Sequence, residues 1–482
     1  MAGDLPPDEL REALRRAADR IAHYLETVGD YPVVPPVAPG DVARQLPESP
    51  PDGPEPMSRI LDDYERLIEP NVTHWNHPGF LAYFGITGSG PGIVGEALAA
   101  SLNVNAMLWR TSPAATELEE RVCDWLRQMM GLPGVFRGHI NDTASTSSLV
   151  ALAAARHRLP GLDIRVKGLA GRPDLPPLTV YASDQAHSSI DKAAIVLGLG
   201  QENVRRIASD EAFRMSVPAL AEAIARDREA GRLPMAVVAT AGTTSTTSVD
   251  PVPEIAGLCE REGIWLHVDA AYAGSAAICP EYRALMPGIE RADSLVVNPH
   301  KWMFTPVDCS VLFVRDPALL RAAFSLIPEY LRTDEPVTNL MDLGFQLGRR
   351  FRALKLWMVI RSFGVEGLRG LIREHCAAAR ELAAWIEADP GFELAAPVPF
   401  SAVCFRALPA DRNAPPAEQD RFNERLLARV NAAGPFFLSP TVLHRRYTPR
   451  VAIGNIRTTR EHMAQLWRLL SESAAALRRL SS

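Results

Sequence analysis

Short apolar runs alternate with helical segments through the middle of the chain, between about residues 90 and 360. Segment 147–156 has a helical pattern, and runs rich in β-branched residues predict strands at 178–183, 235–241, 264–268, 294–298 and 310–314. This alternation is typical of an α/β fold, in which helices flank a mostly parallel sheet. In open sheets of this kind, ligands bind at the carboxyl ends of the strands. We therefore expect a functional site where these runs end.

The amino-terminal part of the chain has a different pattern. Residues 1–30 predict an amphipathic helix that lacks the apolar core a signal peptide requires. Residues 31–57 are rich in proline, which fixes φ and has no N–H donor, so they predict an extended connector. A long connector beside a compact domain is often laid over a neighbouring subunit. We therefore interpret residues 1–89 as a dimerisation segment.

After about residue 365 the pattern changes again. A helix at 374–388, strands at 402–407 and 450–453, and a final helix from Thr459 predict a smaller α+β domain. The chain is thus expected to have three parts, namely a helical and proline-rich segment, a large ligand-binding domain and a small C-terminal domain, at residues 1–89, 90–362 and 363–482.

Composition and charge narrow the classes of partner. The 482 residues are 47% hydrophobic, enough for a large core, and the net charge of -6 gives no basic field for nucleic acid or an anionic membrane. No stretch is apolar over the length that spans a bilayer. The six cysteines lie in apolar segments without C-x-x-C pairs or metal-ligand spacing, which predicts buried thiols and no metal site. These features predict a cytoplasmic protein.

Two charged residues follow predicted strands. Asp269 comes directly after the run 264–268, and Lys301 comes shortly after the run 294–298. Residues so placed can face the two ends of one pyridine ring, the carboxylate at the ring nitrogen and the amine forming an imine, as pyridoxal 5′-phosphate (PLP) chemistry needs. Asp269 would keep the ring nitrogen protonated, and burial would help Lys301 to lose its proton and become a nucleophile. The alternative is that both are unrelated charged residues at strand ends.

The segments around both residues resemble a known family. NPHKW at 298–302 and HVDAAYAG at 267–274 are similar to the group II PLP-dependent decarboxylases, and to the aromatic L-amino acid decarboxylases in particular. The resemblance implies PLP fold type I, the aspartate aminotransferase-like fold, in a homodimer with active sites at the subunit interface. It also implies decarboxylation of an L-amino acid, of aromatic preference, to an amine and CO₂. Further matches run in order along nearly the whole chain: THW at 73–75, FLAYF at 80–84, SPAATELE at 112–119, SDQAHSS at 183–189, GTT at 242–244 and LGRRFR at 347–352.

The resemblance assigns roles to residues around the cofactor. Lys301 would form the imine, Asp269 would pair with the ring nitrogen, and His187 would stack on the ring face opposite Ala271. Without the family, His187 could be a satisfied core histidine. The segment 141–150 opens a helix whose first N–H groups can bind a phosphate, although its Ser and Thr residues could be simple N-caps. The further cofactor contacts that the family implies are Ala144, Ser145, Thr244, Asn298 and His300.

Tyr330 matches a tyrosine on the family's mobile loop, which is thought to protonate the substrate carbon after CO₂ has left. The alternative is an ordinary loop tyrosine. Related enzymes that convert the amino acid oxidatively to an aldehyde have phenylalanine there, so Tyr330 and His187 favour amine formation. Two other functions stay open at this point: decarboxylation coupled to oxidative deamination, and a catalytically silent PLP-fold binding protein.

The family's substrate pocket is matched only in part. Trp75 and Tyr83 match its aromatic walls. Ile86 belongs to a Gly-Ile pair where animal DOPA decarboxylases have Pro-Thr, and Asn105 and Met107 replace larger residues that reach over from the partner subunit. These departures leave the identity of the amino acid open.

One glycine motif is not assigned to a nucleotide. Gly90, Gly92 and Gly95 satisfy G-x-G-x-x-G, but a dinucleotide site also needs an adjoining strand and an acidic residue about twenty positions later. The sequence there is MLWRTS, which has no acidic residue. We expect these glycines to bend the chain near the substrate cleft.

Overall fold

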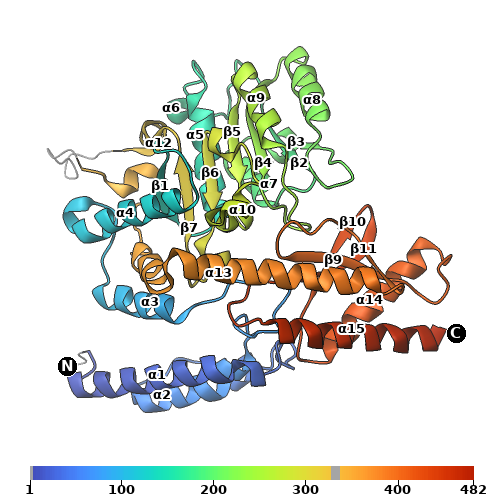
Figure 1. The fold of residues 1–482 in the computed structure, drawn as a ribbon. Coiled ribbons are helices and arrows are strands. Elements are labelled where there is room, and N and C mark those ends of the chain that lie inside the picture. The colour runs from blue at the N-terminus through green and yellow to red at the C-terminus, as the bar shows by residue number, and fades with distance from the viewer. Residues whose placement is uncertain (1–3, 327–336, 482) are drawn as a thin grey trace.

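The computed structural model describes residues 4–326 and 337–481, whose arrangement Figure 1 shows. Seven strands form the central sheet: β1 (Arg137–Asn141), β2 (Leu178–Ser183), β3 (Val204–Ile207), β4 (Leu233–Thr240), β5 (Trp265–Asp269), β6 (Ser294–Val297) and β7 (Ser310–Val314). Their spatial order is β1-β7-β6-β5-β4-β2-β3. The strands from β3 to β6 run parallel, and β7 is antiparallel to both of its neighbours. The predicted mostly parallel α/β sheet is confirmed.

Helices cover both faces of this sheet. They are α4 (Pro113–Met129), α5 (Ala144–Arg158), α6 (Ile164–Lys167), α7 (Ser189–Val196), α8 (Val217–Glu229), α9 (Val252–Glu262), α10 (Pro280–Arg283), α11 (Pro299–Trp302) and α12 (Pro317–Phe324). Successive side chains of a strand point to opposite faces, so Val237 packs with α4, α8 and α9, whereas Val238 packs with α5 and α7. Because both faces are buried, the strands read as continuous apolar runs.

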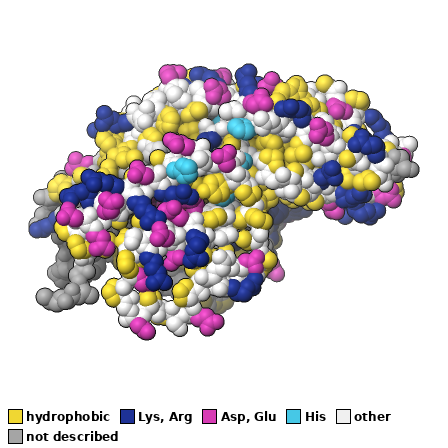
Figure 2. Space-filling view, turned by 90° about the horizontal axis from the view of Figure 1, so that it is seen from below, with side chains coloured by type: hydrophobic (Ala, Val, Ile, Leu, Met, Phe, Trp, Pro, Cys, Tyr) yellow, Lys and Arg dark blue, Asp and Glu magenta, His cyan; other side chains and the backbone are white. Residues whose placement is uncertain are grey.

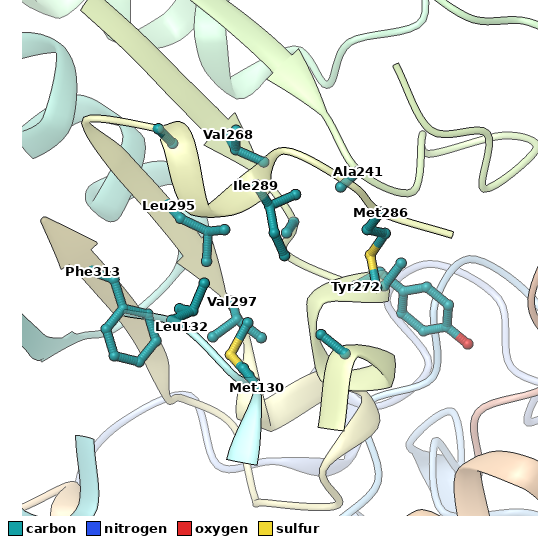
Figure 3. Close-up of a cluster of buried hydrophobic side chains, with 14 of the residues drawn as sticks. Met130, Leu132, Ala241, Val268, Tyr272, Met286, Ile289, Leu295, Val297 and Phe313 are labelled. Atoms are coloured by element: carbon teal, nitrogen blue, oxygen red, sulfur yellow. The ribbon is translucent and has the colours of Figure 1, made fainter. Parts of the chain in front are cut away.

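The core on the α4 side is built from neighbouring strands. Figure 3 shows Val268 of β5, Leu295 of β6 and Phe313 of β7, with Met130 and Leu132 from the segment that follows α4. None of these five side chains is more than 4% exposed. Burying each large apolar side chain stabilises the fold by about 1.5–3 kcal/mol, so this cluster holds the strand ends rigidly in place.

A long helix, α13 (Ala353–Ala388), connects the large domain to the small C-terminal domain, as Figure 1 shows. Its backbone leaves the helical conformation at Gly364, which has φ 64° and ψ 171°. The predicted domain boundary between residues 362 and 363 falls within this helix. The small domain has an antiparallel sheet in the order β10-β11-β9-β8 and two further helices: β8 (Phe392–Leu394), β9 (Ala402–Ala407), α14 (Pro416–Ala432), β10 (Ser439–Leu443), β11 (Arg446–Ala452) and α15 (Arg460–Ser481).

The amino-terminal segment lies along one edge of the molecule, at the bottom of Figure 1. It contains α1 (Pro7–Thr27) and α2 (Met57–Asp63), and the proline-rich connector between them forms no α-helix. No residue of α1 is buried, and its Leu10 and Leu14 are 42% and 60% exposed. None of the helices within residues 4–326 and 337–481 has the length and apolar character that crossing a lipid bilayer requires.

The expectation that the glycine motif bends the chain is wrong. Gly90, Gly92 and Gly95 all lie within one regular helix, α3 (Gly90–Leu102). A Cβ atom at Gly92 would lie 2.2 Å from Pro306 Cδ, and one at Gly95 would lie 2.7 Å from Lys355 Cα. Gly92 therefore allows α3 to pack closely against the loop between α11 and β7, and Gly95 allows it to pack closely against α13.

Candidate active site

A cavity of about 440 Å³ opens at the carboxyl ends of the parallel strands. Thr240 ends β4, Asp269 ends β5 and Asn298 follows β6, and all three line the cavity. Lys301 reaches it from α11, the single helical turn after Asn298. Because the parallel strands share one direction, residues distant in the sequence meet at this edge of the sheet.

Asp269 and Lys301 line the same cavity. Asp269 is 6% exposed, and its Oδ1 accepts a hydrogen bond from the backbone N–H of Ala271 over 3.1 Å. Burial lowers the pKa of Lys301; the charge of Asp269 opposes this shift and the charge of Arg450 adds to it. A lysine with a lowered pKa is more readily deprotonated, which a nucleophilic amine requires.

One end of the cavity is suited to an anion. Helix α5 begins at Ala144, so the first N–H groups of the helix, at Ala144 and Ser145, have no partner within it, and both residues line the cavity. Asn298, which lines the cavity and is 2% exposed, carries an amide NH₂ that can donate to an anion, while its Oδ1 has no hydrogen-bond partner in the part of the chain that is described. His300 accepts a backbone N–H at Nδ1 over 2.9 Å, and burial lowers its pKa to about 3. Its ring is therefore neutral with the hydrogen on Nε2, a further donor.

The middle of the cavity is bounded by residues that follow three different strands. His187 comes after β2, Thr244 after β4 and Ala271 after β5, and all three line the cavity. The structure thus gathers every cofactor contact that the resemblance implied, from Ala144 to Lys301, around one space.

Sequence reasoning missed Arg450, which comes from β11 of the small domain. It is 3% exposed, its Nε donates to the carbonyl of Ser245 over 2.7 Å, and its Nη1 donates to the carbonyl of Tyr83. Its Nη2 has no hydrogen-bond partner among the residues described. An arginine at the start of the predicted apolar strand 450–453 was the available signal. Other lining residues to which the sequence analysis gave no role are Phe84, Ser189, Gly242, Tyr272, Ser439, Pro440 and Thr441, the first four of them within matched family motifs.

The predicted substrate-binding residues are only partly brought together. Tyr83 lines the cavity, with its backbone at φ 54°, and Trp75 stacks against it with ring centroids 6.1 Å apart. Trp75, Ile86, Asn105 and Met107 are not among the residues that line this cavity. Asn105 Nδ2 instead donates to Met107 Sδ over 3.1 Å. Tyr330 lies outside the described residues.

The residues present fit PLP. The cavity has the size of a small-molecule site, and buried polar atoms of Thr240, Asn298 and Arg450 have no hydrogen-bond partner within the described parts of the chain. A helix amino terminus, a buried carboxylate and a lysine of lowered pKa provide for a phosphate, a ring nitrogen and an aldehyde. Fold and site together define a PLP-dependent enzyme of fold type I.

The comparisons with known proteins agree with this class. Residues 39–408 match the family described as "Pyridoxal-dependent decarboxylase conserved domain". The chain belongs to this family. It is 41% identical to phenylacetaldehyde synthase of Arabidopsis thaliana, with 98% of this chain and 96% of that enzyme covered. It is also 41% identical to tyrosine decarboxylase 2 of Narcissus pseudonarcissus, with 98% and 95% covered.

Solved structures extend the similarity to the whole fold. The structure of Oryza sativa TDC with PLP and tryptamine has a TM-score of 0.94 and 37% identity, covering 99% of this chain and 100% of that one. The structure of mouse CSAD has a TM-score of 0.89 and 28% identity, covering 97% and 99%. The chain is therefore a PLP-dependent amino acid decarboxylase, a carboxy-lyase.

Proposed function

We propose that this enzyme converts an aromatic L-amino acid to the corresponding amine and CO₂, with Lys301, Asp269, His187 and Tyr330 as its catalytic residues. The observation that carries the proposal is the single cavity lined by Lys301, Asp269 and His187. Curated relatives named as tyrosine and tryptophan decarboxylases, at 41% and 40% identity, support the aromatic preference.

PLP, when bound, supplies a ring that accepts the electron pair left behind by the departing CO₂. Asp269 would hold a proton at the ring nitrogen, because a buried carboxylate stabilises a neighbouring cation. Lys301 would bind the cofactor through its unprotonated Nζ. Ala144 and Ser145 would bind the phosphate through their N–H groups, together with Asn298.

The remaining cavity residues would bind and orient the substrate. Thr244 and His300 would complete the cofactor contacts, and Tyr83 would offer an aromatic wall backed by Trp75. Arg450 would attract the α-carboxylate, because its Nη2 is buried and has no hydrogen-bond partner in the described chain. Tyr330 would donate a proton to the substrate carbon.

The test is a substrate screen of the PLP-loaded enzyme. We expect amine and CO₂ from at least one of tyrosine, tryptophan, phenylalanine or DOPA, detected by mass spectrometry. Lys301→Ala is the control and should lose both the visible absorption of covalently bound PLP and CO₂ release. Absence of CO₂ from every aromatic amino acid, or full activity of Lys301→Ala, would contradict the proposal.

A second product is favoured by one observation, since a relative with 41% identity is named phenylacetaldehyde synthase. In that reaction the amino acid would lose CO₂, O₂ would take up two electrons and become hydrogen peroxide, and water would release the nitrogen as ammonia and leave an aldehyde. Measuring peroxide and amine in the same turnover separates the two reactions. Tyr330 and His187 support amine as the main product.

We also propose a homodimer with the active site at the subunit interface, to which Asn105 and Met107 of one protomer would contribute in its partner's pocket. Three apolar side chains of α3 support this, because Val94, Leu98 and Leu102 are 54%, 46% and 59% exposed. Figure 2 shows the molecule from the side where α1 lies in Figure 1, with hydrophobic side chains exposed among charged ones. A second copy would bury them.

A cytoplasmic location is likewise proposed. All six cysteines are free and buried in the structure, which suits a reducing compartment. Cell fractionation with an antibody to the native protein would test it.

A further inference from the structure

The side chain of His187 contacts Ser189, two residues further along the chain. Its Nδ1 lies 3.1 Å from the backbone nitrogen of Ser189 and 2.9 Å from the Ser189 hydroxyl oxygen. A peptide N–H can only donate, so Nδ1 is an acceptor in this contact. Ser189 is 3% exposed and begins α7, so its N–H is one of the first-turn donors that a helix leaves unused.

The position of the hydrogen on His187 follows from this contact. A neutral imidazole has one donor and one acceptor nitrogen, so when Nδ1 accepts, the hydrogen is on Nε2. Burial lowers the pKa of His187; Asp269 on β5 opposes this, and Lys301 on α11 and Lys192 on α7 add to it. The net lowering keeps the ring neutral near pH 7.

The hydroxyl of Ser189 reinforces the same state. In the neutral ring it donates to Nδ1 alongside the backbone N–H. A protonated ring would turn its Nδ1–H toward that backbone N–H, which cannot accept it, and only the hydroxyl could reverse its role. Hydrogen bonds to the neutral form of a base lower its pKa. Ser189 also lines the cavity, so it acts within reach of the reacting groups.

We propose that Ser189 is a positioning residue that holds His187 as the neutral Nε2–H tautomer, so that the ring presents a hydrogen-bond donor, and not a proton acceptor, to the cavity. This inference rests on the proposed role of His187 in the decarboxylase. It assigns His187 to orienting an electronegative atom of the substrate or cofactor. It also excludes His187 as a general base in the resting enzyme, because its acceptor nitrogen is occupied by Ser189.

The first test needs no turnover. Long-range ¹H–¹⁵N correlation spectra of the PLP-free protein, labelled with ¹⁵N-histidine, report the tautomer of each ring, and His187→Asn identifies the His187 signals. We expect Nε2 to be protonated and Nδ1 unprotonated at pH 7.5. A protonated Nδ1 in the neutral ring would overturn the proposal.

Titration of the same signals tests Ser189 itself. Ser189→Ala removes the hydroxyl but keeps the backbone N–H, and one hydrogen bond lost from the neutral form should raise the pKa of His187 by about half a unit to one unit. Ser189→Thr, which keeps a hydroxyl, and Ser188→Ala, at the exposed neighbouring position, are the matched controls and should leave the pKa in place. An unchanged pKa in Ser189→Ala, or an equal shift in Ser188→Ala, would overturn the role of Ser189.

The PLP-loaded enzyme gives an independent readout. The acid limb of its kcat/KM profile should move to higher pH in Ser189→Ala, with activity about three- to tenfold lower on that limb and recovered above pH 8. Should Ser189→Ala fold poorly, Ser189→Cys, of similar size with a weaker donor, gives the same comparison. Loss of activity equal at every pH would overturn the proposal, whereas inactivity of the wild type toward all amino acids would contradict only the proposed function.

Discussion

Asp269 is fixed by the backbone that surrounds it, because its Oδ1 accepts the N–H of Ala271 and its strand is buried on both sides. Asp269→Asn keeps the size of the side chain and removes its charge. We expect kcat to fall by about 10²–10³-fold, the range for loss of one preorganised electrostatic contact, and PLP affinity to weaken. Steady-state kinetics and a PLP titration measure both effects.

Asp293 provides the control for this change. It is a largely buried carboxylate that accepts the backbone N–H of Leu266 over 2.8 Å and does not line the cavity. Asp293→Asn should therefore lower the melting temperature while leaving PLP affinity near the wild-type value. Equal loss of activity in both variants would remove the special role of Asp269.

Single residues differ in how far the sequence could identify them. Asp269 and Lys301 were found because each charge interrupts or follows an apolar strand, which is where ligands bind in parallel sheets. Arg450 was missed because it reaches the cavity from the other domain, and only the fold brings β11 to β5. The contact between Ser189 and His187 depends on local backbone geometry, which no spacing rule reveals.

At the scale of structural elements, a stack of aromatic rings supports α11, the helical turn that carries Lys301. Tyr272 stacks on Phe84 with ring centroids 3.8 Å apart and on Trp302 with centroids 4.6 Å apart. Trp302 Nε1 in turn donates to His375 Nδ1 on α13 over 2.9 Å. The stack therefore anchors the residue next to Lys301 to the long helix.

Trp302→Phe tests this support. A phenylalanine keeps the stacking but leaves the buried His375 Nδ1 without its donor, which should lower the free energy of unfolding by about 1–3 kcal/mol. The melting temperature of the PLP-free protein measures the effect. Trp357→Phe, a half-buried tryptophan on the same helix as His375, is the control and should change the melting temperature less. A smaller shift at Trp302 than at Trp357 would contradict the anchoring role.

The sequence predicted some strands with their observed bounds and missed others. The strands at 178–183, 310–314 and 402–407 were predicted with the observed bounds, because each is a run of apolar residues buried on both faces. Strands β1 and β3 were missed, since RGHIN and VRRI include charged residues that lie at the sheet edges. In such a short run the apolar and polar residues do not alternate regularly enough to indicate a strand.

For the whole molecule, buried histidines set the response to acid. Burial lowers the pKa of His139 and His300 to about 3 and of His267 and His375 to about 4. In the unfolded chain these groups bind protons near pH 6.5, so their contribution to stability is lost as the pH falls from about 6.5 toward 4. Asp250, whose pKa burial raises to about 6, acts in the opposite direction over the same range.

Urea unfolding at pH 7 and pH 5 measures this balance. Each such histidine should account for about 2 kcal/mol of lost stability between the two pH values. His139→Gln removes one titrating group outside the cavity, so the variant should lose less stability than the wild type between pH 7 and pH 5. An unchanged pH dependence in this variant would show that His139 does not titrate in the unfolding reaction.

The proposed dimer is tested at the same scale. Leu98→Glu places a charge on the exposed apolar face of α3 and should shift the molecular mass measured by light scattering from dimer toward monomer. Val166→Glu changes a side chain that is 79% exposed on α6 and serves as the control. A wild-type protein that runs as a monomer at all concentrations would contradict the homodimer.

Gly364 interrupts α13, which spans both domains, and the cavity is lined by Lys301 from before this break and by Arg450 from after it. A ligand that contacts both residues therefore connects the large domain to the small C-terminal domain. By linkage, a substitution at Gly364 that shifts the relative position of the two domains would change ligand affinity by the same free energy that the ligand exerts on that position.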